Sequence, residues 1–136
     1  MLLIDGKGLP LGIDLHSASP AEVRLIEPLL DNHVLDQHAP RLIYDRAADS
    51  DPLRDRLAQD GIQLICPHRK GRRKRHHAQD GRVLKRYRQR WKVERTIAWL
   101  GNYRRLLTRF ERYPRLFLAF AQLACLHRCL HRLKPL

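Results

Sequence analysis

Apolar residues in the first part of the chain occur in short runs that are separated by turn residues. Residues 2–4 and 9–15 flank the turn Asp-Gly-Lys-Gly, a pattern that predicts a β-hairpin. Ser19 and the proline after it precede apolar residues at helical spacing. This pattern predicts a helix over about 20–31 with Ser19 as its N-cap.

The middle of the chain repeats the order of strand and helix. Residues 41–44 and 62–66 are short apolar runs that predict two strands. Between them, Ser50 opens an amphipathic helix that ends at Gly61. The order β-β-α-β-α-β indicates an α/β fold in which a mixed sheet packs against helices, and it favours a site where the strand 41–44 ends.

The second half of the chain has helical periodicity. A long helix is predicted over about 83–100, and a last helix begins at Pro114. We expect the apolar face of each helix to be turned toward a core. The face of the first helix comprises Val83, Tyr87, Trp91, Glu94 and Ala98, and the face of the last comprises Leu116, Phe120, Leu123, Leu126, Leu130 and Leu133.

Composition and the lengths of the apolar runs argue against a membrane-spanning or secreted protein. The 136 residues are 43% hydrophobic, which fits one modest domain or part of a larger one. The longest apolar run, 116–126, is far shorter than the roughly 20 residues that cross a bilayer. No secretory signal is visible and the three cysteines form no even framework, so we expect a reducing cytoplasm and no membrane contact.

Charge is divided unevenly along the chain. Residues 1–65 contain 11 acidic and 6 basic residues, whereas residues 66–136 contain 3 acidic and 21 basic residues. The net charge of +13 favours a polyanionic partner. The acidic half is able to supply carboxylates and the basic half to neutralise phosphates, a combination that suits an enzyme acting on DNA or RNA.

Glu94 is the first candidate for a site residue. It shares the predicted buried face with aromatic residues, and a buried carboxylate must be paired or bind a metal ion. The alternative is a simple surface ion pair with Arg90, one turn earlier.

Asp45 is the second candidate because it ends a predicted strand, where metal ligands are commonly placed. We interpret Asp49 and Asp51 as loop and capping residues.

Residues 68–80 form a basic loop, which we expect to be mobile. Its cations are expected to follow a phosphate backbone and to supply affinity rather than sequence specificity. A solvated loop with no partner is the alternative. The cations are Arg69, Lys70, Arg72, Arg73, Lys74 and Arg75.

Cysteines and histidines alternate near the C-terminus, at Cys125, His127, Cys129 and His131. On a helix the two thiols face one way and the two imidazoles roughly the other, and the spacing lacks a usual zinc-finger pattern. We therefore interpret them as core thiols and surface histidines.

Three segments together resemble the DDE transposases of bacterial insertion sequences, in particular the insertion-sequence "five" group. The last of them also fits the related pattern Tyr-x2-Arg-x3-Glu-x6-Lys, except that Gly101 replaces the lysine. In the second segment Ala48 replaces the usual tyrosine. The segments are Ile4-Asp5-Gly6-Lys7-Gly8-Leu9-Pro10-Leu11, Tyr44-Asp45-Arg46-Ala47-Ala48-Asp49-Ser50 and Arg90-Trp91-Lys92-Val93-Glu94-Arg95-Thr96-Ile97-Ala98-Trp99-Leu100.

The resemblance implies an RNase H-like fold, a mixed sheet with flanking helices, in which two aspartates and a glutamate bind two Mg²⁺ (or Mn²⁺) ions. Asp45 and Glu94 correspond to the second aspartate and the glutamate, and are the implied catalytic residues and metal ligands. Tyr87 and Arg90 are expected to hold DNA near the metals. Arg104 or Arg105 is expected to act in place of the lysine.

The family's first aspartate lies on a central strand that we expect to precede these residues. Residues 1–136 are thus expected to be a partial catalytic domain, with the basic loop at 68–80 and a C-terminal helical part at 83–133. With only two of the carboxylates, we expect weak metal binding and little or no activity from this chain alone. The expected partners are the ends of an insertion sequence, target DNA, and a second copy of the protein on DNA.

A non-catalytic nucleic-acid-binding module is the competing hypothesis. It rests on the basic half, in which Trp91, Trp99 and Tyr103 are interleaved with cations as possible stacking groups. A basic ribosome-associated or RNA-associated protein is a third possibility, which explains the charge but not the positions of Asp45 and Glu94.

Overall fold

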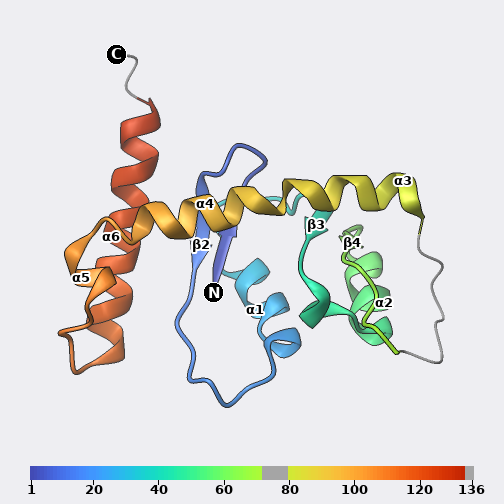
Figure 1. Cartoon of the computed structure of the whole chain (residues 1–136), viewed down its shortest axis with the longest axis horizontal. Helices are drawn as coiled ribbons and strands as arrows, with labels where there is room; N and C mark the ends of the chain where they lie inside the picture. The colour runs from blue at the N-terminus through green and yellow to red at the C-terminus, as the bar shows by residue number, and fades with distance from the viewer. Residues whose placement is uncertain (72–79, 134–136) are drawn as a thin grey trace. The chain divides into compact units, whose positions relative to one another are not determined.

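The computed structural model describes residues 1–71 and 80–133 of the chain (Figure 1). The chain forms two compact units. The first unit comprises Met1–Ser19, Glu27–Leu35 and Lys92–Leu136, and the second comprises Pro20–Ile26 and Asp36–Trp91. Among the helices of the described residues, none is long and apolar enough to cross a membrane.

The first unit opens with the predicted hairpin. Strands β1 (Leu2–Ile4) and β2 (Pro10–Ile13) pair antiparallel, with Leu2 opposite Ile13. The Asp5 carboxylate shapes the turn because its Oδ1 accepts hydrogen bonds from the backbone N–H groups of Lys7 and Leu9, both at 2.8 Å. Gly8 completes the turn at φ 87°, a conformation that glycine adopts at little cost.

Helix α6 (Pro114–Leu133) also belongs to the first unit and begins at the predicted proline. Its buried residues are small: Ala121, Ala124 and Cys125, the last two packed with Leu100. Our prediction that the leucine face is turned toward the core is wrong, because most of those leucines are exposed. Small side chains allow α6 to approach β2 and the end of helix α4 closely, whereas the leucines are too large for that contact.

The second unit contains a parallel strand pair with its crossover helix. Strands β3 (Arg41–Ile43) and β4 (Gln63–Ile65) pair in register, with Leu42 opposite Leu64. Helix α2 (Asp51–Gln59) connects them. Its capping signals are those predicted from the sequence: the Ser50 hydroxyl accepts from the Leu53 N–H, and Gly61 follows the helix at φ 74°. Leu53 and Leu57 on its inner face are almost fully buried.

The α/β class predicted from the sequence is confirmed, but the strands do not form one mixed sheet. In the described residues they form two sheets of two strands each, β1 with β2 and β3 with β4. The hairpin packs on α6 instead of joining the parallel pair. Each sheet therefore serves a different unit.

The helix predicted over 20–31 is shorter than expected. A 3₁₀ turn, η1 (Glu22–Arg24), precedes helix α1 (Ile26–Asp31), and the residue that precedes η1 is Ala21 rather than the predicted cap Ser19. Pro28 explains the late start, because a proline without an N–H fits the first turn of a helix but not its interior.

The chain is helical throughout the predicted segment 83–100, but not as one α-helix. Helix α3 (Gly81–Leu84) continues into the 3₁₀ helix η3 (Lys85–Arg90), which leads into α4 (Trp91–Leu100). A short helix, α5 (Arg104–Leu107), follows. The 3₁₀ segment is rich in arginine and lysine.

The predicted buried face of α4 is also wrong. Thr96 and Leu100 are 3% and 7% exposed, whereas Trp91 is 50% exposed and both Glu94 and Ala98 are exposed. The helix is turned this way because Thr96 and Leu100 meet the rest of the first unit, which keeps the Glu94 carboxylate in water, where its charge costs least.

Candidate active site and nucleic-acid interface

Asp45 lies in the turn that follows β3, at the carboxyl end of the parallel strands. It is the N-cap of the 3₁₀ turn η2 (Arg46–Ala48), and its Oδ1 accepts a hydrogen bond of 2.7 Å from the backbone N–H of Ala47. This bond occupies one carboxylate oxygen and fixes the direction of the side chain. The sequence thus correctly predicted the position of Asp45 at a strand end.

Asp49 ends the same turn and is buried. Its Oδ1 accepts from Arg54 Nη1 at 2.7 Å and lies 3.0 Å from His68 Nδ1, and its Oδ2 accepts from the Arg69 N–H at 2.7 Å. Burial alone raises the pKa of this carboxyl, but the hydrogen bonds and the positive charge of Arg54 outweigh burial and hold the pKa well below its usual value. Asp49 is the C-cap of η2, which agrees with the prediction, but Asp51 is the first residue of α2 rather than a cap. Both side chains are buried, which no local sequence signal indicates.

The Arg69 side chain holds the same turn from the other side. Its Nε donates to the carbonyl oxygen of Arg46 at 3.0 Å, and its Nη2 donates to that of Ala47 at 2.8 Å. The two bonds, with the Arg69 N–H bond to Asp49, tie the start of the basic segment to the turn that carries Asp45. A residue predicted to bind DNA is thus also a support of the candidate site.

Tyr44 lies near the predicted site residues Asp45 and Arg90, whose charges act on its hydroxyl. Its hydroxyl donates to Glu22 Oε2 at 3.4 Å. Burial, together with the negative charges of Glu22 and Asp45, raises the pKa of Tyr44 to about 12, while the positive charge of Arg90 opposes this rise. Arg90 Nη1 in turn donates to the Tyr87 hydroxyl at 3.1 Å. Asp45, Arg90 and Tyr87 therefore share one neighbourhood, and sequence reasoning missed the role of Glu22 in it.

Glu94 lies in the first turn of α4, within the first unit. The hairpin turn fixes this helix: the buried Thr96 hydroxyl donates to the Gly8 carbonyl at 2.9 Å, and Lys92 Nζ donates to the Gly6 carbonyl at 2.6 Å. A Cβ at Gly8 would lie 3.3 Å from Thr96 Oγ1, so the glycine permits this close approach. The first sequence motif therefore supports the helix that carries Glu94.

Asp45 and Glu94 alone do not fit a site for two metal ions. They belong to different units, so neither unit contains both carboxylates. Across residues 1–71 and 80–133, no three His, Cys, Asp or Glu side chains gather into a group that could hold an ion. Two carboxylates offer too few ligands for two divalent cations, which take six or more oxygen ligands each.

The other predicted DNA-binding residues have separate surroundings. Lys70 is exposed, and so is Arg104 in α5. Arg105 Nη1 donates to Glu111 Oε1 at 2.7 Å, and its guanidinium lies 4.8 Å from the centre of the Phe120 ring. Because those contacts hold the Arg105 side chain within the first unit, Arg104 is the freer of the two to meet a phosphate. Arg72, Arg73, Lys74 and Arg75 lie outside the described residues.

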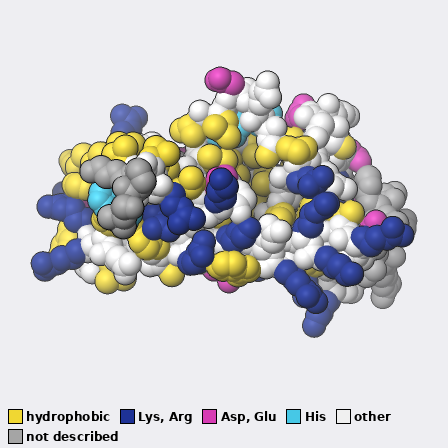
Figure 2. Space-filling view, turned by 90° about the horizontal axis from the view of Figure 1, so that it is seen from above, with side chains coloured by type: hydrophobic (Ala, Val, Ile, Leu, Met, Phe, Trp, Pro, Cys, Tyr) yellow, Lys and Arg dark blue, Asp and Glu magenta, His cyan; other side chains and the backbone are white. Residues whose placement is uncertain are grey.

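Sequence reasoning missed a group of cations on α3 and η3. The side chains are exposed and belong to the same helical segment as Tyr87 and Arg90. Figure 2 shows many Lys and Arg side chains and few Asp or Glu on the face that it presents. The density of arginine and lysine in this segment was the available signal. The four cations are Arg82, Lys85, Arg86 and Arg88.

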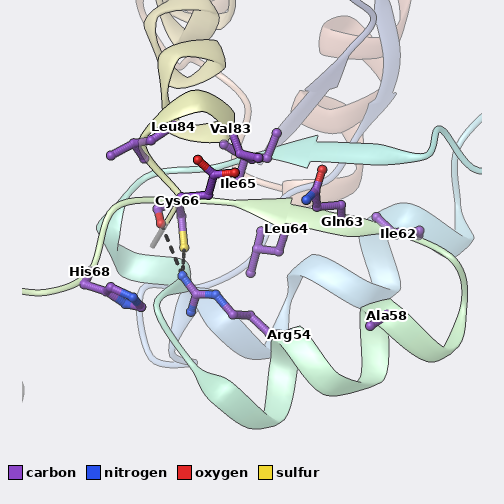
Figure 3. A pocket seen from close by; sticks show the side chains of 11 residues that line it. Arg54, Ala58, Ile62, Gln63, Leu64, Ile65, Cys66, His68, Val83 and Leu84 are labelled. Carbon is purple, nitrogen blue, oxygen red and sulfur yellow. Dashed lines mark hydrogen bonds between the residues drawn. The ribbon is translucent and has the colours of Figure 1, made fainter. Parts of the chain in front are cut away.

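A pocket in the second unit lies between α2, β4 and α3 (Figure 3). Arg54 points to Cys66 there, and its Nη2 donates to the carbonyl oxygen at 3.2 Å and contacts Sγ at 2.9 Å. Burial raises the pKa of the Cys66 thiol, which keeps it protonated and a weak nucleophile. Leu64 and Leu84 contribute an apolar lining, so the pocket presents packing surface rather than a reactive centre.

The cysteines and histidines of α6 lie on the predicted sides of the helix. Cys125 is buried, and His127 and His131 are exposed. His127 Nδ1 lies 2.6 Å from the Tyr103 hydroxyl, and its ring stacks with Trp99 at a centroid distance of 6.4 Å. This cluster joins the end of α4 to α6.

Comparison with known proteins agrees with the sequence motifs. The sequence model of a family described as the transposase DDE domain matches residues 1–129, a range that contains Asp45, Glu94 and all the predicted DNA-binding residues. The chain is 34% identical over 143 residues to a Burkholderia cepacia protein described as a transposase for insertion sequence element IS402. This alignment covers 98% of the chain but 63% of the relative, so the chain spans less than two thirds of that protein. No solved structure matches the chain.

Proposed function

Because the chain belongs to the transposase DDE family, we propose that it acts in DNA cleavage and strand transfer during transposition, as one portion of a longer transposase. The lengths support the second part of this proposal, because the chain aligns over almost its whole length yet spans 63% of its relative. The first catalytic aspartate then lies in sequence that these 136 residues do not contain.

The observation that carries the proposal is the arrangement around Asp45. In the turn after β3, the Ala47 N–H donates a hydrogen bond to this carboxylate. The Arg69 side chain donates two hydrogen bonds to carbonyl oxygens of the same turn. Arg90 and Tyr87 lie in the same unit, close enough for the Arg90 charge to act on Tyr44. A fixed carboxylate beside a cation and a tyrosine suits a site that receives a phosphodiester.

Glu94 is the second carboxylate that we assign to catalysis. The hairpin turn holds its helix through Thr96 and Lys92. The resemblance implies that Asp45 and Glu94 bind Mg²⁺ or Mn²⁺. Because these two residues alone do not fit a two-ion site, the remaining ligands must come from another part of the longer protein.

The proposed DNA surface consists of cations on α3, η3 and the start of the basic segment, all in the second unit and all exposed except the half-buried Arg90. Arg104, in the first unit, is a separate proposed phosphate contact. These cations neutralise phosphates and release counterions, so DNA affinity falls steeply as salt rises. The contact is with the backbone and carries no base specificity. The surface comprises Arg82, Lys85, Arg86, Arg88, Arg90 and Lys70, with Tyr87 and Arg69 beside it.

The test compares the wild-type chain with Asp45→Asn, Glu94→Gln and the control Asp55→Asn, an exposed aspartate on α2. Fluorescence anisotropy measures binding to a labelled DNA duplex, and a supercoiled plasmid reports nicking in the presence of Mg²⁺. We expect all four proteins to bind DNA, with the two site variants binding equally or slightly more tightly because a negative charge is lost. Nicking by this chain alone is expected to be weak or absent, and any nicking is expected to disappear in the two site variants only.

The same assays repeated on the transposase extended at its N-terminus separate the two parts of the proposal. Activity that requires both Asp45 and Glu94 in the extended protein supports the assignment of the site. Robust strand transfer by the 136 residues alone contradicts the claim that they are a portion. If all variants are indistinguishable in every assay, the alternative of a non-catalytic nucleic-acid-binding module replaces the proposal.

A further inference from the structure

The segment 108–113 connects α5 to α6 within the first unit (Figure 1) and presents two aromatic rings to solvent. Phe110 is 63% exposed and Tyr113 is 65% exposed. An aromatic ring has a large apolar area, and covering it is worth more than covering most other side chains. Two exposed rings within four residues therefore indicate a surface that another molecule covers.

The residues around these two rings are strongly basic. Residues 104–115 contain five arginines and one glutamate, a net charge of +4. Arg104, Arg112 and Arg115 are exposed. A protein segment that covered the rings would have to be acidic, or would bury arginines without counterions at a large cost in free energy. Nucleic acid combines negative charge with flat bases, so it matches both the cations and the rings.

The glutamate of residues 104–115 does not weaken this positive surface. The Glu111 side chain is 5% exposed, and its Oε1 accepts a hydrogen bond of 2.7 Å from Arg105 Nη1. The Arg105 guanidinium also lies 4.8 Å from the centre of the Phe120 ring. Because the carboxylate is buried and paired, the exposed charges of residues 104–115 are all positive.

Contacts within the first unit hold the segment 108–113 in place. Arg109 Nε donates to the Glu111 carbonyl oxygen at 3.2 Å, and the Arg109 guanidinium lies 5.5 Å from the centre of the Phe117 ring. Pro114 begins α6 directly after Tyr113, and a proline disfavours the helical conformation for the residue before it. A backbone that is fixed before binding loses less conformational entropy when its side chains are covered.

We propose that Phe110 and Tyr113 stack on unpaired bases of single-stranded DNA, and that the three exposed arginines of residues 104–115 contact the phosphates of the same strand. This inference rests on the proposed function, which makes DNA the partner, and adds the form of DNA that this surface binds. Aromatic rings stack on the faces of bases, which are open in a single strand and covered by neighbouring bases in a duplex. Three residues of extended chain span at most about 11 Å, so both rings reach nearby nucleotides of one strand.

The test measures binding of the full 136-residue chain to two labelled probes, a single-stranded oligonucleotide and a blunt duplex of the same sequence. The disrupting variant is Phe110→Leu with Tyr113→Leu, which keeps apolar side chains and removes the rings. The matched control is Phe110→Tyr with Tyr113→Phe, which exchanges the two rings. We expect fluorescence anisotropy to show that the dissociation constant for the single strand rises about tenfold or more in the leucine variant and stays within about twofold in the control. The dissociation constant for the duplex is expected to stay within about twofold in both variants, because a duplex offers the rings no open base faces.

The milder change Arg112→Gln provides a second measurement if the leucine variant fails to fold, which circular dichroism reports. It removes one positive charge from an exposed side chain and leaves both rings in place. The logarithm of the affinity for the single strand falls linearly with the logarithm of the salt concentration, and we expect the slope to become shallower by about 0.7 in this variant. An unchanged slope contradicts the assignment of Arg112 to a phosphate of the single strand.

The outcomes separate this inference from the proposed function. If the leucine variant binds the single strand as the wild type does while duplex binding persists, the inference is overturned and the proposed function stands. The rings then have another cover, such as a further segment of the longer protein. Equal losses of affinity for both probes in the leucine variant also overturn the inference. Ring-dependent binding of the single strand, combined with an extended transposase whose activity does not require Asp45 and Glu94, supports the inference and overturns the proposed function.

Discussion

The two units are stabilised in different ways. The second unit encloses the charged group Asp49, whose carboxylate receives hydrogen bonds from side chains and backbone. The first unit encloses small apolar residues of α6 beside the hairpin, and most leucines of α6 are exposed to solvent. The comparison teaches that a buried charged network positions the candidate site residue Asp45. The helix that carries Glu94 is instead positioned by two hydrogen bonds to the hairpin turn and by the apolar contact at Leu100.

The largest expected effect is on the polar network. Asp49→Asn removes the negative charge and leaves the buried Arg54 guanidinium without its counterion. We expect the free energy of unfolding to fall by about 3–5 kcal/mol, measured by urea denaturation. The control Asp55→Asn changes an exposed aspartate of the same unit and is expected to stay within about 0.5 kcal/mol of wild type. Equal losses in both variants contradict the role assigned to Asp49.

Leucines of the two units are expected to respond differently to truncation. Leu57 is 1% exposed, so Leu57→Ala opens a cavity in the core of the second unit. We expect the free energy of unfolding to fall by about 2–5 kcal/mol. Leu130→Ala, at a residue of α6 that is 51% exposed, is expected to change the free energy of unfolding by less than about 0.5 kcal/mol. A large loss at Leu130 means that this leucine packs against another part of the chain.

The Thr96 hydroxyl makes one of the two hydrogen bonds between the hairpin turn and α4. Thr96→Val keeps the side-chain shape but leaves the buried Gly8 carbonyl without its donor, so we expect a loss of about 1–3 kcal/mol. Thr96→Ser retains the hydroxyl and is expected to restore most of this loss. Thermal unfolding of the three proteins measures the difference, and a Val variant as stable as the Ser variant argues against the hydrogen bond.

Acid provides the finest test of the polar network. The pKa of Asp49 is lower in the folded chain than in the unfolded chain, so its contribution to stability is fully present above about pH 4 and is lost as pH falls toward the folded pKa. Over that window the contribution falls by about 1.4 kcal/mol per pH unit. Asp49→Asn lacks this contribution, so the difference in stability between wild type and variant should shrink as pH falls below 4. A constant difference contradicts the assignment.

Local signals in the sequence predicted the elements that depend on local chemistry. Ser50 and Gly61 mark the ends of α2, and Asp5 and Gly8 mark the hairpin turn, because a cap or a positive φ acts within a few residues. Asp45 was placed correctly for the same reason. Pro28 is also a local signal, because it lies in the first turn of α1, whereas the Ser-Pro pair at 19–20 precedes no helix directly.

The orientation of α4 and α6 could not be predicted in this way. Each helix has two faces that are apolar enough to be buried, and periodicity alone does not choose between them. Large residues were favoured for the core, but close approach to the hairpin selects Thr96, Ala121 and Ala124. The network of Asp49 was also missed, because its donors Arg54, His68 and Arg69 are brought together only by the strand pairing.

The contacts of the hairpin turn also bear on how the chain folds as it is synthesised. Thr96 and Gly8 are 88 residues apart, and Cys129 and Pro10 are 119 apart, whereas Asp49 and Arg69 are separated by 20. At about 5–20 residues per second, the hairpin leaves the ribosome roughly 5 to 25 s before the helices that cover it. The Asp49–Arg69 contact of the second unit forms with a much shorter delay. The hairpin is therefore synthesised well before the helices that pack on it.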